Sequence, residues 1–330
     1  MDWKGKRVLV TGAGGFIGSH LTEALVMAGA KVRAMLHYDS RPHRGNLEYA
    51  NPELVRQCET LAGDVVDPHF VFRACEGCDV VFHLAALIAI PYSYVAPSAY
   101  VQTNVVGTLN VLEACRLLQV PRMIHTSTSE CYGTARYTPI DEEHPLQGQS
   151  PYSASKIAAD KLVESYYLSF NLPVATLRPF NTFGPRQSAR AVIPTILSQL
   201  VAGKPELRLG DASPIRDMNY VGNTVEGFMR LAQCDAALGQ VVNVGSGRGV
   251  RIGEIAEMAM KVTGKQVPIV TEAQRQRPSK SEVWTLIASH KKATELMDWT
   301  PKVNLEAGLE LSARFIEKHL HLYRPDEYAI

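Results

Sequence analysis

A glycine-rich run near the N-terminus, VLVTGAGGFIG from Val8 to Gly18, constrains the fold more than any other part of this chain. Gly12, Gly15 and Gly18 are spaced GxxGxxG between an apolar run typical of a buried strand and a segment with helical periodicity. Glycine permits a tight turn and lets the backbone approach a pyrophosphate, whose charge then lies at the helix N-terminus. The run therefore predicts a strand, a dinucleotide-binding turn and a helix.

Strands and helices alternate through the first half of the chain. Segments with the composition of strands are KRVLVTG, AKVRAML, DVVFHLAA, RMIHTST and PVATLRPF, and helical patterns separate them. This alternation predicts an α/β fold with a Rossmann-type, doubly wound parallel sheet and right-handed crossovers. After about residue 180, strands shorten and proline and glycine become frequent. We expect residues 1–180 to form an NAD(P)-binding Rossmann domain and residues 181–330 a smaller, mixed substrate lobe, with strands near 240–247 rejoining the first domain.

Composition and charge exclude several classes of protein. The 330 residues include 34 basic and 33 acidic side chains without a basic stripe, so neither nucleic acid nor an anionic membrane is an expected partner. No apolar run is long enough to span a membrane, and the start MDWKGKRVLVTG contains no signal-peptide core. We expect a cytoplasmic protein with six reduced cysteines. No His, Cys and Asp cluster has metal-ligand spacing, so no metal is predicted.

The end of the second predicted strand bears on the choice of cofactor. An NAD enzyme usually places there an acid that holds the ribose hydroxyls. Here the strand ends at His37, and Asp39 comes late, followed by Arg41. Basic side chains favour the 2′-phosphate of NADP, whereas an Asp39 that curls back favours NAD; we favour NADP. The predicted cofactor contacts, which include an adenine site after the third strand and the HLAA segment of the fourth, are Gly12, Gly15, Phe16, Ile17, Gly18, His37, Asp39, Arg41, Asp64, Val65, Leu84, Ala85 and Ala86.

The segment SPYSASK, Ser150 to Lys156, combines a helix start with two residues suited to acid–base chemistry. Serine at the N-cap and proline at the first helical position predict the helix, and the four-residue spacing places Tyr152 and Lys156 on one face. There the ammonium can lower the pKa of the phenol, helped by a cationic nicotinamide ring, so that Tyr152 becomes a general base near neutral pH. Both residues also belong to the predicted cofactor contacts.

A second polar cluster, TSTSECYG from Thr126 to Gly133, directly follows the apolar run RMIH. It places Thr128, Ser129 and Glu130 side by side at the mouth of the predicted sheet. A strand end that only had to pack or turn would not require two hydroxyls and a carboxylate there. We predict that these three residues are catalytic. The alternative for Glu130 is a solvated acid or a partner of Arg186.

These motifs resemble the extended short-chain dehydrogenase/reductase family, and within it the nucleotide-sugar epimerase and dehydratase branch. The family's order and spacing are present in TGAGGFIG, STSECYG and YSASK, and its substrate-lobe signatures are similar to RPFNTFGPR (178–186), RDMNYVGN (216–223) and VNVGSG (242–247). The resemblance covers nearly the whole chain. It implies a nucleoside-diphosphate sugar as substrate, a tightly bound nicotinamide cofactor that is recycled in each turnover, and a homodimer that pairs helices near 98–117 and 151–170.

Within this branch, the resemblance makes Glu130 the residue that distinguishes the reactions. Plain 4-epimerases need only the hydroxyl at the position of Thr128, whereas 4,6-dehydratases have a glutamate at the position of Glu130. In dehydratases, oxidation at C4 of the sugar acidifies the C5 proton, the glutamate removes it, water leaves from C6 and the hydride returns to C6. The resemblance thus implies a lyase of the EC 4.2.1 type. Ser129 replaces the aspartate of dTDP-glucose dehydratases, as in GDP-mannose 4,6-dehydratase, which leaves proton delivery to Glu130 or to a water relayed by Ser129.

Other functions on the same scaffold stay open. One is a 4-epimerase, and another is a UDP-glucuronate decarboxylase, because those enzymes also carry Thr-Ser-Glu and use a second-lobe arginine such as Arg186 or Arg190. The tyrosine-rich loop at 88–100 weighs against a decarboxylase. Together with the segment 275–283, it is most similar to dehydratases of legionaminic-acid-type pathways, which act on nucleotide-linked N-acetylglucosamine, here the UDP or GDP form. From another class, a dinucleotide-sensing protein would have no use for an intact catalytic set.

The resemblance also assigns the contacts with the nucleotide sugar. Asn181 and Arg216 would hold the diphosphate, since a guanidinium binds phosphate oxygens at two points. Arg277 and Glu282 would flank the nucleoside, while Asn104 would organise backbone rather than touch substrate. The predicted substrate contacts are Tyr92, Ser93, Asn181, Arg190, Arg216, Arg277 and Glu282.

Overall fold

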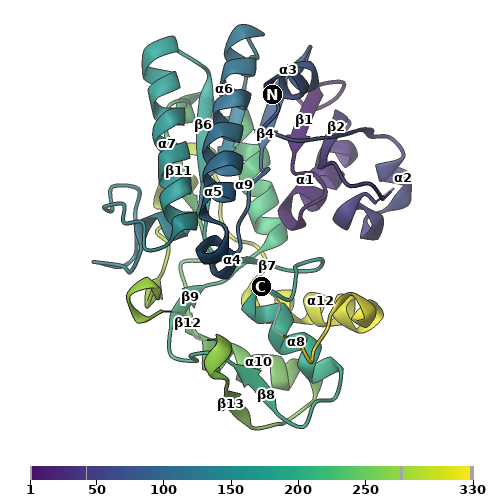
Figure 1. Ribbon diagram of the computed structural model, residues 1–330, viewed down its shortest axis with the longest axis vertical. Coiled ribbons are helices and arrows are strands. Elements are labelled where there is room, and N and C mark those ends of the chain that lie inside the picture. Colours follow the sequence, from purple (N-terminus) through teal and green to yellow (C-terminus); the bar gives the residue numbers. More distant parts are fainter. Residues whose placement is uncertain (1, 42, 276–277, 328–330) are drawn as a thin grey trace.

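A parallel sheet forms the centre of the computed structural model, which describes residues 2–41, 43–275 and 278–327 (Figure 1). Its strands are β1 (Arg7–Thr11), β2 (Lys31–His37), β3 (Glu59–Gly63), β4 (Val80–His83), β5 (Met123–Thr126), β6 (Val174–Pro179) and β11 (Val241–Val244). Their order is β11-β6-β5-β4-β1-β2-β3, and every neighbouring pair is parallel. This arrangement confirms the predicted Rossmann-type α/β fold.

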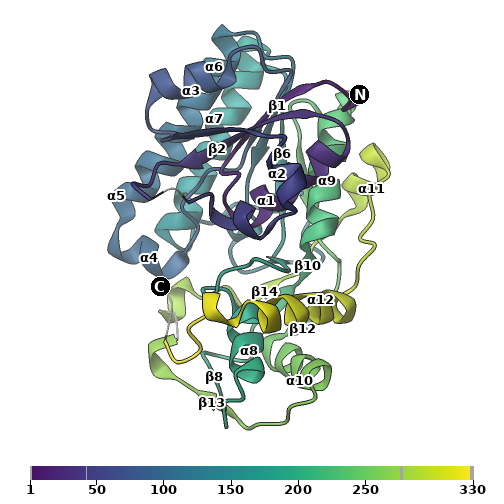
Figure 2. The ribbon, with the colours of Figure 1, turned by 90° about the vertical axis from the view of Figure 1, so that its right-hand side faces the viewer.

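Helices cover both faces of the sheet, as Figures 1 and 2 show. The covering helices are α1 (Phe16–Met27) and α9 (Val221–Gln233) on one face, and α3 (Pro68–Cys75), α6 (Gly107–Leu117) and α7 (Pro151–Phe170) on the other. Each face has its own apolar core, which includes Leu21 and Phe228 beneath the first pair and Val111 and Val163 beneath the second group. Shorter helices are α2 (Pro52–Val55), α4 (Ile90–Val95), α5 (Pro97–Tyr100) and α11 (Lys291–Met297).

A smaller lobe lies at the carboxyl ends of the strands (Figure 2). The chain enters this lobe directly from the carboxyl end of β6. Its elements are β7 (Thr182–Phe183), α8 (Val192–Val201), β8 (Leu207–Leu209), β9 (Ile215–Asp217), β10 (Asn219–Tyr220), β12 (Gly249–Arg251), α10 (Ile252–Thr263), β13 (Ile269–Thr271), β14 (Thr285–Leu286) and α12 (Leu305–Lys318). Helices α8, α10 and α12 enclose a third core that contains Leu197, Ile255 and Leu309. Among the described helices, none combines the length and apolar character needed to cross a membrane.

The chain crosses between the two lobes more than once. After entering the smaller lobe it returns to the sheet through α9 and β11, and β11 pairs with β6 at the edge of the sheet. We therefore propose a division at about residue 180 in which the segment from α9 to β11 belongs to the first lobe. The candidate site lies where the carboxyl ends of the strands face the smaller lobe.

Candidate active site

Helix α7 begins with the residues that the sequence marks as a helix start. Ser150 is the N-cap, and its side chain accepts a hydrogen bond from the backbone N–H of Ser153. One turn of helix separates Tyr152 from Lys156, and both side chains are buried. The ammonium of Lys156 donates to the carbonyl oxygen of Thr126 at 2.6 Å, which ties α7 to the end of β5.

The electrostatics of Tyr152 differ from the sequence-based expectation. Burial is the largest influence and raises the pKa of the phenol, a hydrogen bond with the Thr128 hydroxyl lowers that pKa, and the charge of Glu130 raises it. Lys156, from which we expected the lowering, directs its ammonium at the carbonyl of Thr126 instead. Burial also lowers the pKa of Lys156, against the charge of Asp160. Thr128 is thus the neighbour that favours the tyrosinate here.

The second polar cluster forms a short 3₁₀ turn, η3 (Ser129–Tyr132), at the end of β5. Thr128 is its N-cap, and its hydroxyl accepts a hydrogen bond from the backbone N–H of Glu130 at 3.3 Å. Glu130 is only 8% exposed, which excludes a solvated acid. The ion pair of Arg186 is with Glu23, at 2.6 Å, so the interpretation of Glu130 as a partner of Arg186 is wrong. Glu130 instead lies close enough to Tyr152 to influence its phenol.

A π-helical stretch interrupts the helix that packs against the start of α7. The single helix expected near 98–117 is instead α5, a π-helical stretch Val101–Val106 and α6. Such insertions often occur at functional sites because they reorient side chains. Here Asn104 is buried and its amide bonds the backbone N–H and C=O of Leu87, both at 2.9 Å, and the Ser155 hydroxyl. Its contacts agree with the role expected for it in organising backbone.

The glycine turn has the close backbone packing that a dinucleotide site requires. A Cβ at Gly12, where φ is 70°, would lie 2.8 Å from the backbone nitrogen of Ala85, and one at Gly18 would lie 2.2 Å from the carbonyl oxygen of Gly12. Gly15 is the N-cap of α1, and no side chain of the described residues caps this helix end with a hydrogen bond. The first turn of the helix has no acidic residue. The N–H groups and dipole of this helix end therefore suit a pyrophosphate.

Thr11, a residue that we did not single out from the sequence, organises the floor of this turn. Its hydroxyl accepts from the backbone N–H groups of Leu84 and Ala85, both at 3.1 Å, and bonds His83 at 2.9 Å. It thereby fixes the predicted cofactor segment from Leu84 to Ala86 against β1. Its position at the end of the first strand, directly before the glycine turn, is the signal that could have identified it.

The strand ends next to the turn bring several predicted cofactor residues together. His37 at the end of β2 and Asp64 after β3 approach each other to 3.9 Å. Asp39 pairs with Arg41 at 3.3 Å, and its carboxylate also accepts from the Arg41 backbone N–H. These hydrogen bonds lower the pKa of Asp39. Val65, the residue after Asp64, is buried in the apolar core that contains Val111.

Two predicted substrate residues from distant segments form a pair in the smaller lobe. Arg216 on β9 donates to the carboxylate of Glu282 at 3.0 Å, and both side chains are largely buried. The side-chain oxygen of Asn181 is buried and, among the described residues, has no hydrogen-bond partner. Arg277 lies outside the described residues.

The tyrosine-rich loop and the segment after β7 supply the remaining predicted contacts. Tyr92 on α4 is 40% exposed. Arg190 is exposed, and its charge acts on Tyr100, whose ring packs edge-on against Tyr152 at 6.2 Å between centroids. The structure does not support Ser93 as a substrate contact: this residue is fully buried, and its hydroxyl donates to the carbonyl of Ile90 at 2.6 Å, inside its own helix.

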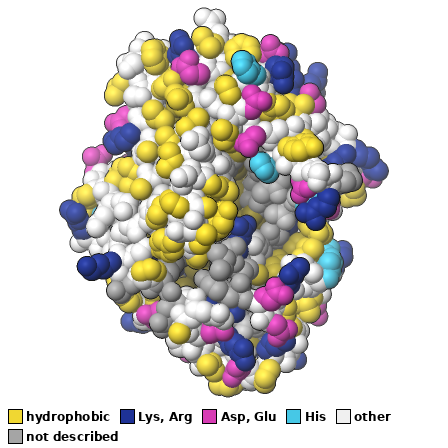
Figure 3. Space-filling view, viewed as in Figure 1, with side chains coloured by type: hydrophobic (Ala, Val, Ile, Leu, Met, Phe, Trp, Pro, Cys, Tyr) yellow, Lys and Arg dark blue, Asp and Glu magenta, His cyan; other side chains and the backbone are white. Residues whose placement is uncertain are grey.

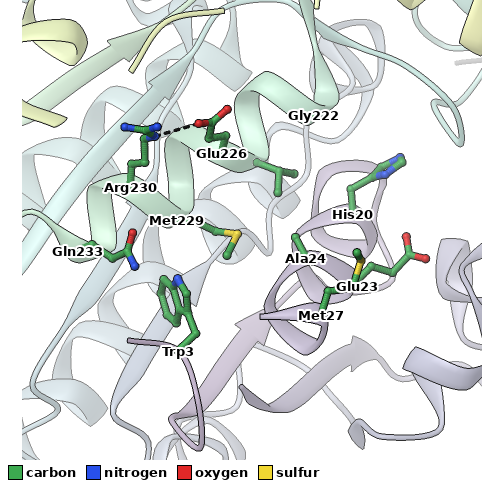
Figure 4. A pocket seen from close by; sticks show the side chains of 11 residues that line it. Trp3, His20, Glu23, Ala24, Met27, Gly222, Glu226, Met229, Arg230 and Gln233 are labelled. Atoms are coloured by element: carbon green, nitrogen blue, oxygen red, sulfur yellow. Dashed lines mark hydrogen bonds and ion pairs between the residues drawn. The ribbon is translucent and has the colours of Figure 1, made fainter. Parts of the chain in front are cut away.

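A separate groove of about 650 Å³ lies between α1 and α9 (Figure 4). Its lining includes Trp3, His20, Met27 and Met229 and contains none of the predicted catalytic, cofactor or substrate residues. The candidate active site is therefore the meeting point of β5, η3 and α7, not this groove.

Comparison with known proteins agrees with this site. A family model described as GDP-mannose 4,6 dehydratase matches residues 9–311. The chain belongs to this family. It is accordingly an enzyme of the NAD(P)-dependent nucleotide-sugar dehydratase and epimerase group, which confirms the predicted extended short-chain dehydrogenase/reductase relationship.

Relatives of this GDP-mannose 4,6 dehydratase family member include both reaction types. UDP-glucose 4-epimerase of Mycolicibacterium smegmatis is 32% identical, with 94% of this chain and 98% of the epimerase covered. The structure of DesIV, a dTDP-glucose 4,6-dehydratase from Streptomyces venezuelae with NAD bound, has a TM-score of 0.86 at 25% identity and covers 97% of this chain and 99% of its own. RMD from Pseudomonas aeruginosa, complexed with NADPH, has a TM-score of 0.80 at 26% identity, with 95% and 99% covered.

Proposed function

We propose that this protein is a nucleotide-sugar 4,6-dehydratase that acts on UDP- or GDP-linked N-acetylglucosamine. The observation that carries the proposal is the burial of Glu130 beside Tyr152 and Thr128. A 4-epimerase needs a tyrosine and a hydroxyl at this point but has no step for a buried carboxylate. A dehydratase needs that carboxylate, because a proton must leave C5 of the oxidised sugar.

Each predicted catalytic residue has a separate role in the proposed dehydration. A nicotinamide ring, when bound, would supply a reversible hydride carrier, which accepts hydride from C4 of the sugar and returns it to C6. Tyr152 takes the proton from the sugar O4, and the hydrogen bond with Thr128 favours the tyrosinate form that does so. Lys156 ties the helix that carries Tyr152 to the end of β5. Glu130 removes the proton from C5, which the ketone at C4 has made acidic. The hydroxyl group at C6 departs as water after protonation by Glu130 or by a water that Ser129 holds. C6 then receives the hydride, and C5 receives the second of the two protons that were taken from O4 and C5.

The remaining predicted residues would bind the two nucleotides. The glycine turn and the residues at the ends of β2, β3 and β4 fit the dinucleotide, and we propose NADP, because no acid ends β2 and Asp39 is engaged by Arg41. One of the compared structures contains NAD and another NADPH. Arg216 and Asn181 would bind the diphosphate of the substrate, Glu282 its nucleoside, and Tyr92 and Arg190 its sugar side. We also propose that the enzyme works in the cytoplasm as a homodimer.

A 4-epimerase is the second candidate, favoured by the 32% identity to UDP-glucose 4-epimerase over most of both chains. One experiment separates the candidates. The protein, with NAD or NADP added, is incubated with UDP-, GDP- and dTDP-sugars, and the products are weighed by mass spectrometry. Loss of water supports the dehydratase. An unchanged mass with a new retention time supports the epimerase, loss of carbon dioxide indicates a decarboxylase, and no turnover of any sugar favours a dinucleotide sensor.

A further inference from the structure

Behind the catalytic pair, one buried carboxylate joins three elements of the Rossmann lobe. Asp160 lies on α7, one turn beyond Lys156. Its Oδ2 accepts hydrogen bonds from the Ser127 hydroxyl and from an Nη of Arg178, both at 2.6 Å. Its Oδ1 lies 3.2 Å from Nε2 of His125. None of these four side chains is more than 6% exposed, and none of them belongs to the catalytic set described above.

Ser127 is the residue that connects this cluster to the catalytic turn, because it directly precedes Thr128. Its hydroxyl donates to Asp160 and accepts from Nε of Arg178 at 3.1 Å. Its backbone N–H donates to the carbonyl of Leu177 on β6 at 2.8 Å. Side chain and backbone are therefore fixed together, which leaves Thr128 little freedom to move relative to β6.

Arg178 holds the other end of the same segment. Its guanidinium lies over the ring of Tyr132, the last residue of η3, 4.7 Å from the ring centroid. The Tyr132 hydroxyl in turn donates to Asn243 on β11 at 2.9 Å. A single arginine thus contacts the first and last residues of the segment from Ser127 to Tyr132, and the residues between them include Thr128 and Glu130.

The charges of the cluster cancel. Burial would raise the pKa of Asp160, but Arg178, His125 and Ser127 together hold it well below its usual range, so the carboxylate is ionised. Arg178 carries the compensating positive charge. Burial and the charge of Lys156 lower the pKa of His125 to about 4, so this imidazole is neutral at pH 7. One anion and one cation therefore hold the segment without net charge beneath the site.

We propose that Ser127, held by Asp160 and Arg178, is a positioning residue that fixes Thr128 and Glu130 in register with Tyr152. Asp160 and Tyr152 share α7, so the same helix that carries the tyrosine also anchors the turn that carries the carboxylate. The catalytic meaning of this arrangement rests on the proposed function. Its geometric consequence, a fixed hydrogen bond between Thr128 and the phenol of Tyr152, does not.

The test replaces Ser127 by alanine in the full chain with oxidised cofactor bound. This change removes the anchor but leaves Asp160 paired with Arg178, so no buried charge loses its partner. The matched control is Ser312→Ala on α12, because Ser312 is also buried but its hydroxyl donates to the carbonyl of Gly308 within its own helix. Should Ser127→Ala not fold, Ser127→Cys keeps the volume and a weak donor.

The first readout is the Tyr152 ring signal in protein labelled with ¹³C-tyrosine, assigned with Tyr152→Phe and recorded without substrate. The titratable neighbours of this phenol are Glu130 and Cys131 on η3, Tyr100 on α5 and Lys156 on its own helix. When the hydrogen bond between Thr128 and the phenol is loosened, the chemical shift of the Tyr152 ring changes at neutral pH. The midpoint of its pH titration rises by about half a pH unit or more. The control variant leaves both unchanged.

The second readout is steady-state turnover. Ser127→Ala is expected to lower kcat about tenfold or more with little change in KM, because the variant disturbs groups that act on the reacting bonds. An unchanged tyrosine signal together with an unchanged kcat would overturn the inference even if the protein dehydrates a nucleotide sugar. A shifted tyrosine signal in a protein that dehydrates none of them would leave the inference standing and remove the proposed function.

Discussion

Glu130 is the residue on which the choice of reaction depends. Its carboxylate is buried next to a tyrosine whose phenol it makes harder to ionise, against the influence of Thr128. A protein gains nothing in stability from placing an acid there, because burial of a polar side chain costs free energy. The arrangement is understandable if the carboxylate takes up a proton during the reaction, as the C5 deprotonation requires.

Replacement of Glu130 by glutamine is expected to stop elimination and leave the oxidation step. The amide keeps the shape of the side chain but cannot accept the C5 proton, so dehydration should slow by about 10²- to 10⁴-fold. Absorbance of the reduced nicotinamide should still appear on addition of the nucleotide sugar. The control is Glu164→Gln, an exposed position on α7. Dehydration at the normal rate in Glu130→Gln would remove the role given to this carboxylate.

Thr128 should set the pH dependence of the oxidation step. Its hydrogen bond lowers the pKa of Tyr152, so its loss in Thr128→Ala raises that pKa. Because the tyrosinate is the active form, the rising limb of the pH–rate profile should move to higher pH, by about half a unit or more. Thr128→Ser keeps the hydroxyl and should retain the profile of the parent protein. Equal profiles for the alanine and serine variants would contradict this account.

At the scale of elements, the sequence predicted those strands, turns and helix starts that depend on interactions between neighbours in the chain. The strand–glycine turn–helix unit and the start of α7 depend on neighbours in sequence, and the parallel sheet follows from the alternation of elements. The cluster of Ser127, Asp160 and Arg178 was not predicted, because its members lie 18 to 51 positions apart and come from different elements. The burial of Ser93 was missed for a different reason, since a serine in a loop pattern gives no sign of which way its helix faces.

The end of β2 is where the choice between the two dinucleotides can be tested. Arg41 is exposed and shares hydrogen bonds with Asp39, so it is free to exchange this carboxylate for a phosphate. Arg41→Ala should weaken NADP binding about fivefold to tenfold and leave NAD binding nearly unchanged. Binding is measured by calorimetry, with Lys31→Ala, at the opposite end of the same strand, as the control. Equal losses for both dinucleotides, or none, would contradict the preference for NADP.

At the scale of the whole molecule, one side of the Rossmann lobe exposes apolar side chains. Figure 3 shows hydrophobic side chains gathered over the region that Figure 1 assigns to α4, α5, α6 and α7. The large exposed residues of these elements and of the π-helical stretch include Val95, Val101, Leu117, Leu168 and Phe170. Helix α7 directs Tyr152 and Lys156 inward, whereas Ala154 and Ala158 are exposed. Such small residues, one turn apart, allow a second helix to approach closely.

This surface supports the proposed homodimer, and Val101 is a suitable position to test it. The residue is 49% exposed in the π-helical stretch, and a glutamate there would place a charge in the interface. We expect the parent protein to be a dimer by light scattering and Val101→Glu to be a monomer with the same circular dichroism. Leu311→Glu on α12, at a position that is 40% exposed in the other lobe, should stay dimeric. A monomeric parent protein, or a dimeric Val101→Glu, would contradict a homodimer formed through this surface.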